Sequence, residues 1–240
     1  MKFKLTVIFL LVLIFGANAQ SVTYDNTSYG DDIRTVILQK AISIYDPLPL
    51  IALGSSEKLR LSFDILSPNN EFFNYTYIHC DRNWQESSLQ QMEYISGKLM
   101  GDIVDFKFST NTYQRFTHYA LNFPEKDMEI TKSGNYILKI YRNFDLEDVV
   151  LTRRFMVLDR HTSISTNIRS ATDPEYRFTH QEVDFSVNYE GFTIPNPFLD
   201  VNVTVLQNNS WNNAIYNLKP LFVNNNELSF NYEDKNLFPG

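Results

Sequence analysis

Cysteine, glycine and positive charge are all scarce in this sequence of 240 residues. Its single cysteine, Cys80, can form neither an intramolecular disulfide nor a thiolate zinc site. The 8 glycines and 9 prolines exclude collagen-like or linker-dominated sequence. Acidic residues outnumber basic ones by 28 to 21, which argues against a nucleic acid partner because phosphate binding needs clustered Lys and Arg. With 20% charged and 15% aromatic residues, a disordered chain is also excluded, and an ordered globular protein is left.

The longest apolar run lies at the N-terminus and predicts an export signal peptide over residues 1–19. Two lysines precede Leu5–Phe15, a run of 11 residues that is apolar apart from Thr6, and an Ala-Asn-Ala tripeptide supplies a cleavage site after Ala19. A transmembrane anchor needs about 20 apolar residues. No cysteine sits at the cleavage site, so a lipid anchor is not indicated, and no second apolar run is long enough to span a bilayer. We therefore expect an exported protein that is soluble or peripherally bound to a membrane.

Apolar and polar residues alternate along most of the chain, which predicts strands with one face in a core and one in water. The pattern is cleanest where Leu59, Leu61, Phe63 and Ile65 alternate with polar residues. The predicted strands up to residue 159 are Ile33–Gln39, Lys58–Leu66, Phe72–Cys80, Ile103–Ser109, His118–Phe123, Tyr136–Tyr141 and Val150–Leu158. Seven short strands without helical spacers are typical of an antiparallel sandwich.

A second alternating series begins after residue 160. Its predicted strands are Ser163–Arg169, Glu182–Asn188, Asp200–Leu206, Ala214–Tyr216 and Glu227–Tyr232. The predicted fold class is all-β, with two consecutive immunoglobulin-like or fibronectin-like antiparallel β-sandwich domains, the second incomplete. We assign residues 20–32 to a flexible segment, 33–159 to the first sandwich and 160–240 to the second. Because the chain stops directly after a strand, we expect either a truncated chain or a partner that covers that edge.

Two stretches break the regular spacing of strands. In the long connection Asp81–Asp102, Ser88 and Gln91 match a capping box before an apolar stripe, which predicts a two-turn helix that ends near Gly97. The stretch Gly191–Phe198 holds two prolines, which remove backbone donors, so we predict an edge or an extended arm there.

Tyr136 directly follows the turn formed by Ser133, Gly134 and Asn135, at the head of a predicted strand. Immunoglobulin-like sandwiches place a tyrosine at such a corner, where its hydroxyl bonds back to the preceding backbone. An ordinary core tyrosine fits the position equally well, and both interpretations are compatible with the fold.

Motifs for catalysis or metal binding are absent, so we assign no catalytic, cofactor-binding or metal-ligating residue and predict no enzyme. The four histidines form no pair at metal-ligand spacing. His79, Cys80 and Asp81 are adjacent in sequence. Neighbouring side chains of a strand point to opposite faces, so these three cannot readily share one metal ion. Gly-x-Ser-x-Gly and Gly-rich phosphate motifs are missing. Cys80 is interpreted as a small buried hydrophobe.

Three aromatic residues suggest a binding function instead. Trp84 and Tyr94 lie in the long connection, and Trp211 lies in an Asn-rich turn. Exposed aromatic side chains serve as stacking platforms for sugars and as anchors in protein interfaces. The alternative is that both tryptophans cap the ends of their hydrophobic cores.

Several motifs, in this order, resemble those of a known family. They are Tyr77–Asp81, Trp84, Thr131–Tyr136, Leu151–Val157, Thr179–Phe185, Ile194–Phe198 and Tyr232–Gly240. With these residues the chain resembles the plug proteins of the Bacteroidota type IX secretion system, from about Ile33 to its last residue. Members of that family continue beyond the motif that ends at Gly240, which implies that this chain is truncated.

The resemblance implies a non-enzymatic periplasmic subunit that is peripherally associated with the outer membrane and needs no cofactor. Its partner would be the large outer-membrane β-barrel translocon of the type IX system, whose periplasmic opening it would occlude while no substrate is engaged. Such a part is physically necessary because a wide, water-filled barrel leaks when it is open. No nucleic acid or small-molecule substrate is implied, and no residue of this chain can be assigned to the contact with the translocon.

Two other functions stay open on sequence alone. Trp84, Tyr94 and Trp211 would suit an exported carbohydrate-binding or adhesive β-sandwich module. A periplasmic hydrolase would need two of the 28 acidic residues to converge in a cleft.

Overall fold

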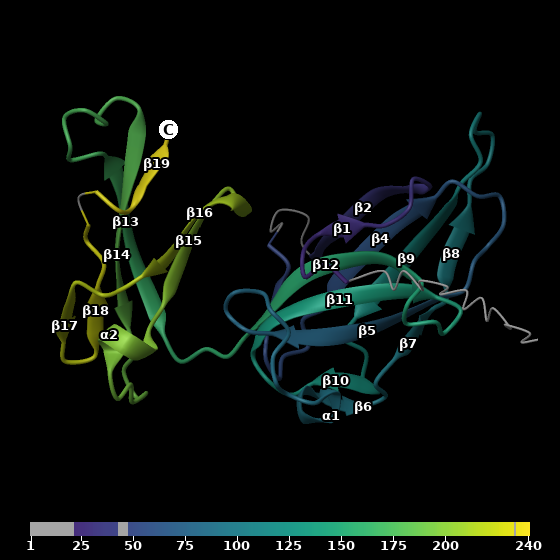
Figure 1. Ribbon diagram of the computed structural model, residues 1–240, viewed down its shortest axis with the longest axis horizontal. Coiled ribbons are helices and arrows are strands. Elements are labelled where there is room, and N and C mark those ends of the chain that lie inside the picture. The colour runs from purple at the N-terminus through teal and green to yellow at the C-terminus, as the bar shows by residue number, and fades with distance from the viewer. Residues whose placement is uncertain (1–21, 43–47, 233) are drawn as a thin grey trace, which may run out of the picture.

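The computed structural model describes residues 22–42, 48–232 and 234–240 (Figure 1). The predicted signal peptide therefore lies outside the described residues. Strands dominate those ranges, and both helices found there are single turns. No helix within the described ranges is long and apolar enough to cross a membrane.

The elements fall into an earlier and a later group along the chain. The earlier group contains β1 (Thr27–Ser28), β2 (Ile33–Lys40), β3 (Leu50–Ala52), β4 (Leu59–Ile65), β5 (Phe73–Cys80), α1 (Gln91–Tyr94), β6 (Ile95–Gly97), β7 (Gly101–Ile103), β8 (Asp105–Phe108), β9 (Thr117–Phe123), β10 (Met128–Ile130), β11 (Gly134–Arg142) and β12 (Val149–Leu158). The later group contains β13 (Ser163–Ser170), β14 (His180–Asn188), α2 (Pro197–Asp200), β15 (Val203–Gln207), β16 (Ser210–Leu218), β17 (Phe222–Asn224), β18 (Glu227–Ser229) and β19 (Leu237–Pro239).

The earlier group is a sandwich of two main sheets. One has the order β1-β12-β11-β5-β7, with β3 parallel to β12, and the other has the order β2-β4-β9-β8. Their facing side chains meet in one core, in which Phe123 of β9 lies 5.8 Å from Tyr77 of β5 and 5.2 Å from Phe155 of β12, measured between ring centroids. The short pair β6–β10 lies beside this sandwich (Figure 1).

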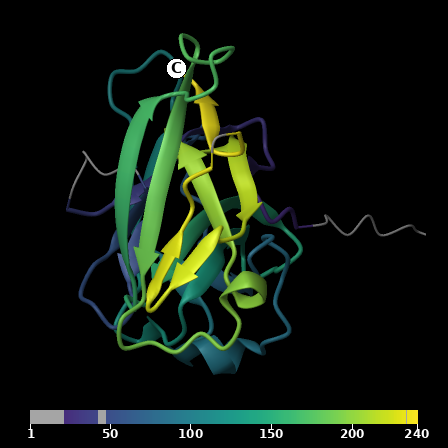
Figure 2. The same cartoon turned by 90° about the vertical axis from the view of Figure 1, so that its left-hand side faces the viewer.

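The later group builds a smaller core. Its main sheet has the order β13-β14-β18-β17, with β19 also paired to β14, and the hairpin β15–β16 forms a second sheet. Phe185 and Phe230 stack at a centroid distance of 4.6 Å within a core that β15 and β16 help to cover. Figure 2 shows the two layers of this group from its outer side. The protein is thus all-β and built as antiparallel sandwiches, as the alternation predicted.

One predicted strand is divided in two. The alternation predicted a single strand over Ile103–Ser109, but β7 ends at Ile103 and β8 begins at Asp105. β7 pairs with β5 in the six-stranded sheet, whereas β8 pairs with β9 in the four-stranded sheet. Val104, an exposed residue, is the point at which the chain crosses between the layers. The alternation gives no sign of this change of sheet, even though Ile103 is buried in β7 whereas every residue of β8 is exposed.

Both irregular stretches differ from prediction. The helix is one turn rather than two, and its capping box is formed by Gln90 and Glu93 instead of Ser88 and Gln91. It ends because Ile95 begins β6, which pairs with β10. In the stretch predicted as an edge or extended arm, Pro197 starts α2. A proline at the first helical position loses no hydrogen bond, and its fixed φ suits a helix.

The N-terminal segment, predicted to be flexible, is fixed along its described part. β1 pairs with β12, and the Asp25 carbonyl accepts a hydrogen bond from Thr152 Oγ1 at 2.7 Å. At the other end of the chain, the final segment forms β19 and is paired with β14, and Gly240 N donates to the Thr179 carbonyl.

Tyr136 satisfies both interpretations of its position. Its ring is fully buried, and its hydroxyl donates to the Lys132 carbonyl, four residues earlier, at 2.8 Å. The bond ties the corner before β11 to the sandwich core, as in immunoglobulin-like folds.

Candidate functional site

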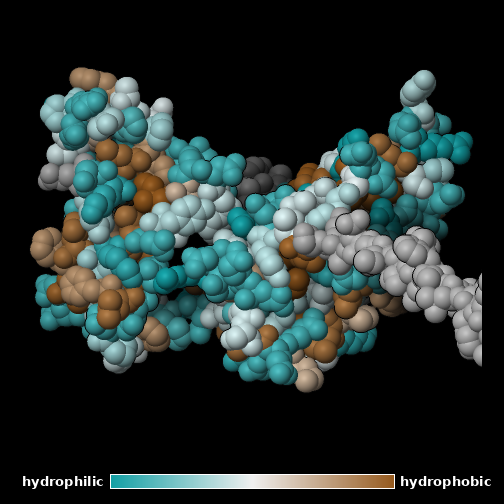
Figure 3. Space-filling model, viewed as in Figure 1, coloured by the Kyte–Doolittle hydropathy of each residue, from teal (hydrophilic) through white to brown (hydrophobic). Residues whose placement is uncertain are grey.

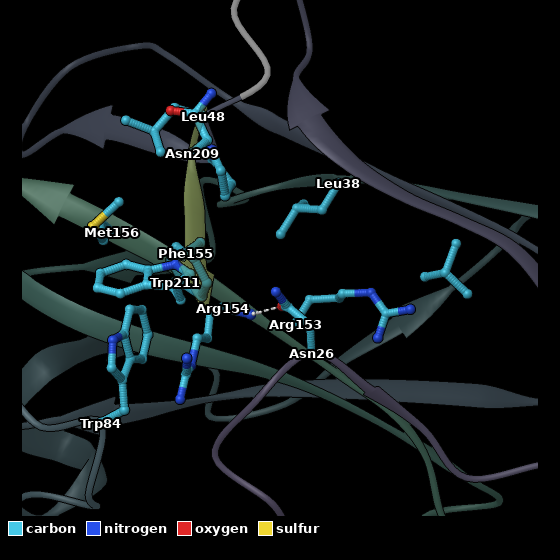
Figure 4. Close-up of a pocket in the computed structure, with 12 residues that line it drawn as sticks. Asn26, Leu38, Leu48, Trp84, Arg153, Arg154, Phe155, Met156, Asn209 and Trp211 are labelled. Atoms are coloured by element: carbon cyan, nitrogen blue, oxygen red, sulfur yellow. Dashed lines mark hydrogen bonds between the residues drawn. The ribbon is translucent and has the colours of Figure 1, made fainter. Parts of the chain in front are cut away.

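A groove lies where the tip of the β15–β16 hairpin meets the side of the first sandwich (Figures 1 and 4). Its volume is about 380 Å³. The lining residues are Asn26, Val36, Leu38, Leu48, Pro49, Trp84, Arg153, Arg154, Phe155, Met156, Asn209 and Trp211. β2 is the edge strand of one sheet, and β12 lies between the short strands β1 and β3 in the other, so both layers of the sandwich contribute to the lining of the groove.

Trp84 is held by a tight turn after β5. Asp81 Oδ1 accepts hydrogen bonds from the backbone N–H groups of Asn83 and Gln85, and Asn135 Nδ2 donates to the Asp81 carbonyl. These bonds hold Trp84 at φ 61°, which is unusual for a bulky residue. Trp84 is 3% exposed, so the turn places its indole inside the protein and not at the surface.

Trp211 reaches the groove because of a two-residue hairpin. Gln207 pairs with Ser210, and Asn208 and Asn209 between them both have positive φ, 53° and 59°. This is the conformation of a type I′ turn, which asparagine tolerates. Trp211 follows in β16, half-buried, and its ring meets Trp84 edge-to-face at 5.1 Å.

Arg154 completes what we call the Trp–Arg–Trp cluster, formed by Trp84, Arg154 and Trp211. Its guanidinium carbon lies 4.6 Å from the Trp84 ring centroid and 5.7 Å from that of Trp211. Cation–π contacts of this kind contribute roughly 0.5–2 kcal/mol. The guanidinium also donates to the Tyr24 carbonyl and lies 3.4 Å from Asp25 Oδ1. The cluster thus joins the N-terminal segment, both sandwiches and the groove (Figure 4).

The neighbouring Arg153 points into the other part of the groove. Its Nη1 donates to the carbonyls of Thr27 and Thr152, and its Nη2 donates to Ser28 Oγ. All three acceptors are neutral. Burial lowers the pKa of Arg153 to about 10. The N-terminal segment therefore positions both arginines.

Most of the aromatic residues proposed as platforms for sugars are buried, whereas that hypothesis requires exposed rings. Trp84 and Tyr94 are both buried, and the Tyr94 hydroxyl donates to the Tyr77 carbonyl. A sugar cannot stack on rings that protein atoms already cover. Only Trp211 keeps part of its face open. The tryptophans instead pack against each other, as caps on their cores.

The candidate chemical groups are separated in the structure. Cys80 is buried, and burial raises the pKa of its thiol to about 12, so it is no nucleophile at neutral pH. His79 Nδ1 lies 2.8 Å from Ser87 Oγ, on the other side of β5. Within the described ranges, no group of three or more His, Cys, Asp or Glu side chains could hold a metal ion.

The fluorescence of Trp84 should report on contact between the two sandwiches. In Trp211→Ala the indole of Trp84 loses its edge-to-face neighbour and gains water, so we expect its emission to shift to longer wavelength and its quenching by acrylamide to increase. Trp211→Phe is the matched control, because it also leaves Trp84 as the sole indole but keeps a ring in place. Equal spectra for the two variants would mean that the hairpin does not cover Trp84 in solution.

β13 is a second exposed feature, at the edge of its sheet. Ile164 and Ile168 pair with Val187 and Val183, whose side chains join the core, yet both isoleucines are more than 60% exposed. Other exposed apolar residues of the later group, brown in Figure 3, lie around α2 and β17. The inner face of the five-stranded sheet is thus left uncovered at β13.

Comparison with known proteins identifies the family. Residues 33–159 match the family model described as "Type 9 secretion system plug protein 1st domain". The structure is similar to the crystal structure of a hypothetical protein from Parabacteroides merdae, with a TM-score of 0.86 and 29% sequence identity. The match covers 91% of this chain and 55% of that protein, so this chain spans about half its length. None of the curated proteins matches. The chain belongs to the type IX secretion system plug protein family.

Proposed function

We propose that this protein is a non-enzymatic periplasmic plug subunit of the type IX secretion system. In this proposal it is exported by a signal peptide cleaved after Ala19, docks peripherally on the large outer-membrane β-barrel translocon, and occludes its periplasmic opening when no substrate is engaged. The observation that carries the proposal is the family match over residues 33–159.

The architecture supports an occluding role. We propose that residues 33–159 and 160–240 are two domains, which the Trp–Arg–Trp cluster joins into a single stiff unit. A plug must resist deformation, and dense aromatic packing in the first sandwich provides that stiffness. The carbohydrate-binding alternative loses its basis because Trp84 and Tyr94 are buried.

Docking is tested by affinity purification of the tagged, full-length native protein from a gently solubilised cell envelope, followed by mass spectrometry. We expect one very large outer-membrane barrel protein in near-stoichiometric amount. An untagged strain processed in parallel gives the background. Recovery of soluble background alone would contradict stable docking.

Occlusion is a separate prediction. If the protein closes the translocon, a deletion strain should admit small solutes that the intact outer membrane excludes, because the water-filled lumen is left open. Uptake of a normally excluded dye measures this. The same deletion in a strain that also lacks the translocon should restore the barrier. Unchanged uptake in the single deletion would count against occlusion even where docking is found.

A further inference from the structure

We propose that the groove beside the Trp–Arg–Trp cluster binds an acidic peptide segment, with a carboxylate of the peptide at Arg153 and its apolar neighbours against Leu38 and Leu48. This binding site goes beyond the plug function and does not rest on it, because it follows from the lining of the groove alone.

The positive charge of the groove favours an anionic ligand. Among the described residues, the charged ones that line the groove are both arginines, on a chain whose formal net charge is −7. Arg154 is already paired with Asp25. Arg153 forms no ion pair with any carboxylate in the described residues, and its guanidinium donates to two carbonyls and a hydroxyl. Burying part of a guanidinium without a carboxylate partner costs free energy. A bound anion would offset part of this cost by forming charge-assisted hydrogen bonds.

The lowered pKa of Arg153 agrees with the lack of a carboxylate partner among the described residues. Burial is the physical cause that lowers the pKa of Arg153, and no acid of the described ranges offsets it. A carboxylate bound at this guanidinium would raise the pKa again, because it favours the charged form.

The apolar lining argues for a peptide rather than an isolated inorganic anion. Val36, Leu38, Leu48, Pro49 and Met156 present hydrocarbon to the groove. Its volume of about 380 Å³ suits a few side chains rather than a single small ion. Tryptophan and arginine are among the residues that most often anchor protein interfaces, and the partly open Trp211 and Arg153 both lie on this groove.

The two tryptophans make binding directly measurable. The chain contains only two, and both line the groove, so intrinsic fluorescence reports on this site without an added probe. The probe is an oriented library of blocked octapeptides, incubated with the purified full-length mature protein. The best binders are then titrated and followed by tryptophan emission.

We expect Asp or Glu to be enriched beside Leu, Ile or Phe, and binding to weaken as ionic strength rises. Replacing the acid of the best peptide by its amide should weaken binding about tenfold, the usual scale for a charge-assisted bond. Arg153→Gln should weaken the acidic peptide equally and leave the amide peptide unchanged. Arg153→Lys should retain most of the affinity. Arg115→Gln, at an exposed arginine outside the groove, is the matched control.

The peptide comparison on the unaltered protein decides the question even if Arg153→Gln fails to fold. No enrichment of acids, or equal binding of the acid and amide peptides, overturns the proposal. Octanoate is titrated in parallel as an acid on a hydrocarbon chain. If octanoate binds while no peptide does, the groove is a lipid site and the peptide proposal is wrong.

Discussion

Replacing Phe155 by alanine is expected to lower the free energy of unfolding of the first sandwich by about 3–5 kcal/mol, the range for deleting a buried aromatic ring. The ring is fully buried and lies 5.2 Å from Phe123, 5.3 Å from Tyr136 and 5.8 Å from Tyr77, measured between centroids. Three large aromatic neighbours cannot collapse fully into the space it leaves, so a cavity cost adds to the lost burial. Equilibrium urea unfolding of the variant and the unaltered protein measures the difference.

Phe178→Ala is the matched control for this experiment. That ring is 93% exposed, so its removal should change stability by no more than about 0.5 kcal/mol. A loss below about 1 kcal/mol in Phe155→Ala would mean that the two sheets do not pack through this ring. Because Phe155 also lines the groove, the variant should alter tryptophan emission even before unfolding.

β5 and β11 are buried on both faces over most of their length, yet most strands of the two main sheets could be predicted from sequence because apolar residues recur at alternate positions. β4 shows this most plainly, since buried and half-buried residues alternate over its whole length. Elements whose pairing is set by distant partners escaped prediction. β1 and β3 are short and depend on β12, and β6 owes its extended backbone to β10. Tertiary pairing overrides local pattern in such segments.

The groove could be predicted only in fragments. Trp84 and Trp211 were singled out from sequence, but 127 positions separate them, and nothing local shows that a hairpin brings them together. The adjacent asparagines, Asn208 and Asn209, are the signal that predicts a tight turn at this point. Arg153 and Arg154 looked like ordinary strand residues in the family motif. Their role emerges only when the N-terminal segment is seen to hold them.

The later sheet carries a charge network on the face opposite its apolar core, with two buried carboxylates, and this network gives the second large prediction. Glu182 is fully buried; its Oε1 accepts from Arg169 Nη2 and its Oε2 from Thr172 N, both at 2.7 Å. Asp184, two residues on, accepts from Arg169 and from Asn236. Burial alone would raise the pKa of Glu182, but the hydrogen bonds from Thr172 and Arg169 outweigh it and hold the pKa below its usual value.

We expect Glu182→Gln to reduce the local stability of the later sheet by about 1.5–3 kcal/mol at neutral pH, the range for hydrogen bonds to a charged group. Because the pKa of Glu182 is lower in the folded than in the unfolded protein, its ionisation stabilises the fold above the unfolded pKa, and this stabilisation is lost as pH falls through the folded pKa. The stabilities of the two proteins should therefore converge on acidification.

Amide hydrogen exchange in β13 and β14 is the suitable measurement, since it reports the local opening of this sheet separately from the first sandwich. Glu175→Gln, at an exposed residue of the neighbouring loop, should change neither the stability nor its pH dependence. A constant difference between Glu182→Gln and the unaltered protein at every pH would show that shape, not charge, makes Glu182 stabilising. Arg169 of this network belongs to β13, whose apolar side chains Ile164 and Ile168 are exposed. A loss of protection confined to β13 would therefore mean that Arg169, rather than a covering layer, holds this edge strand on the sheet.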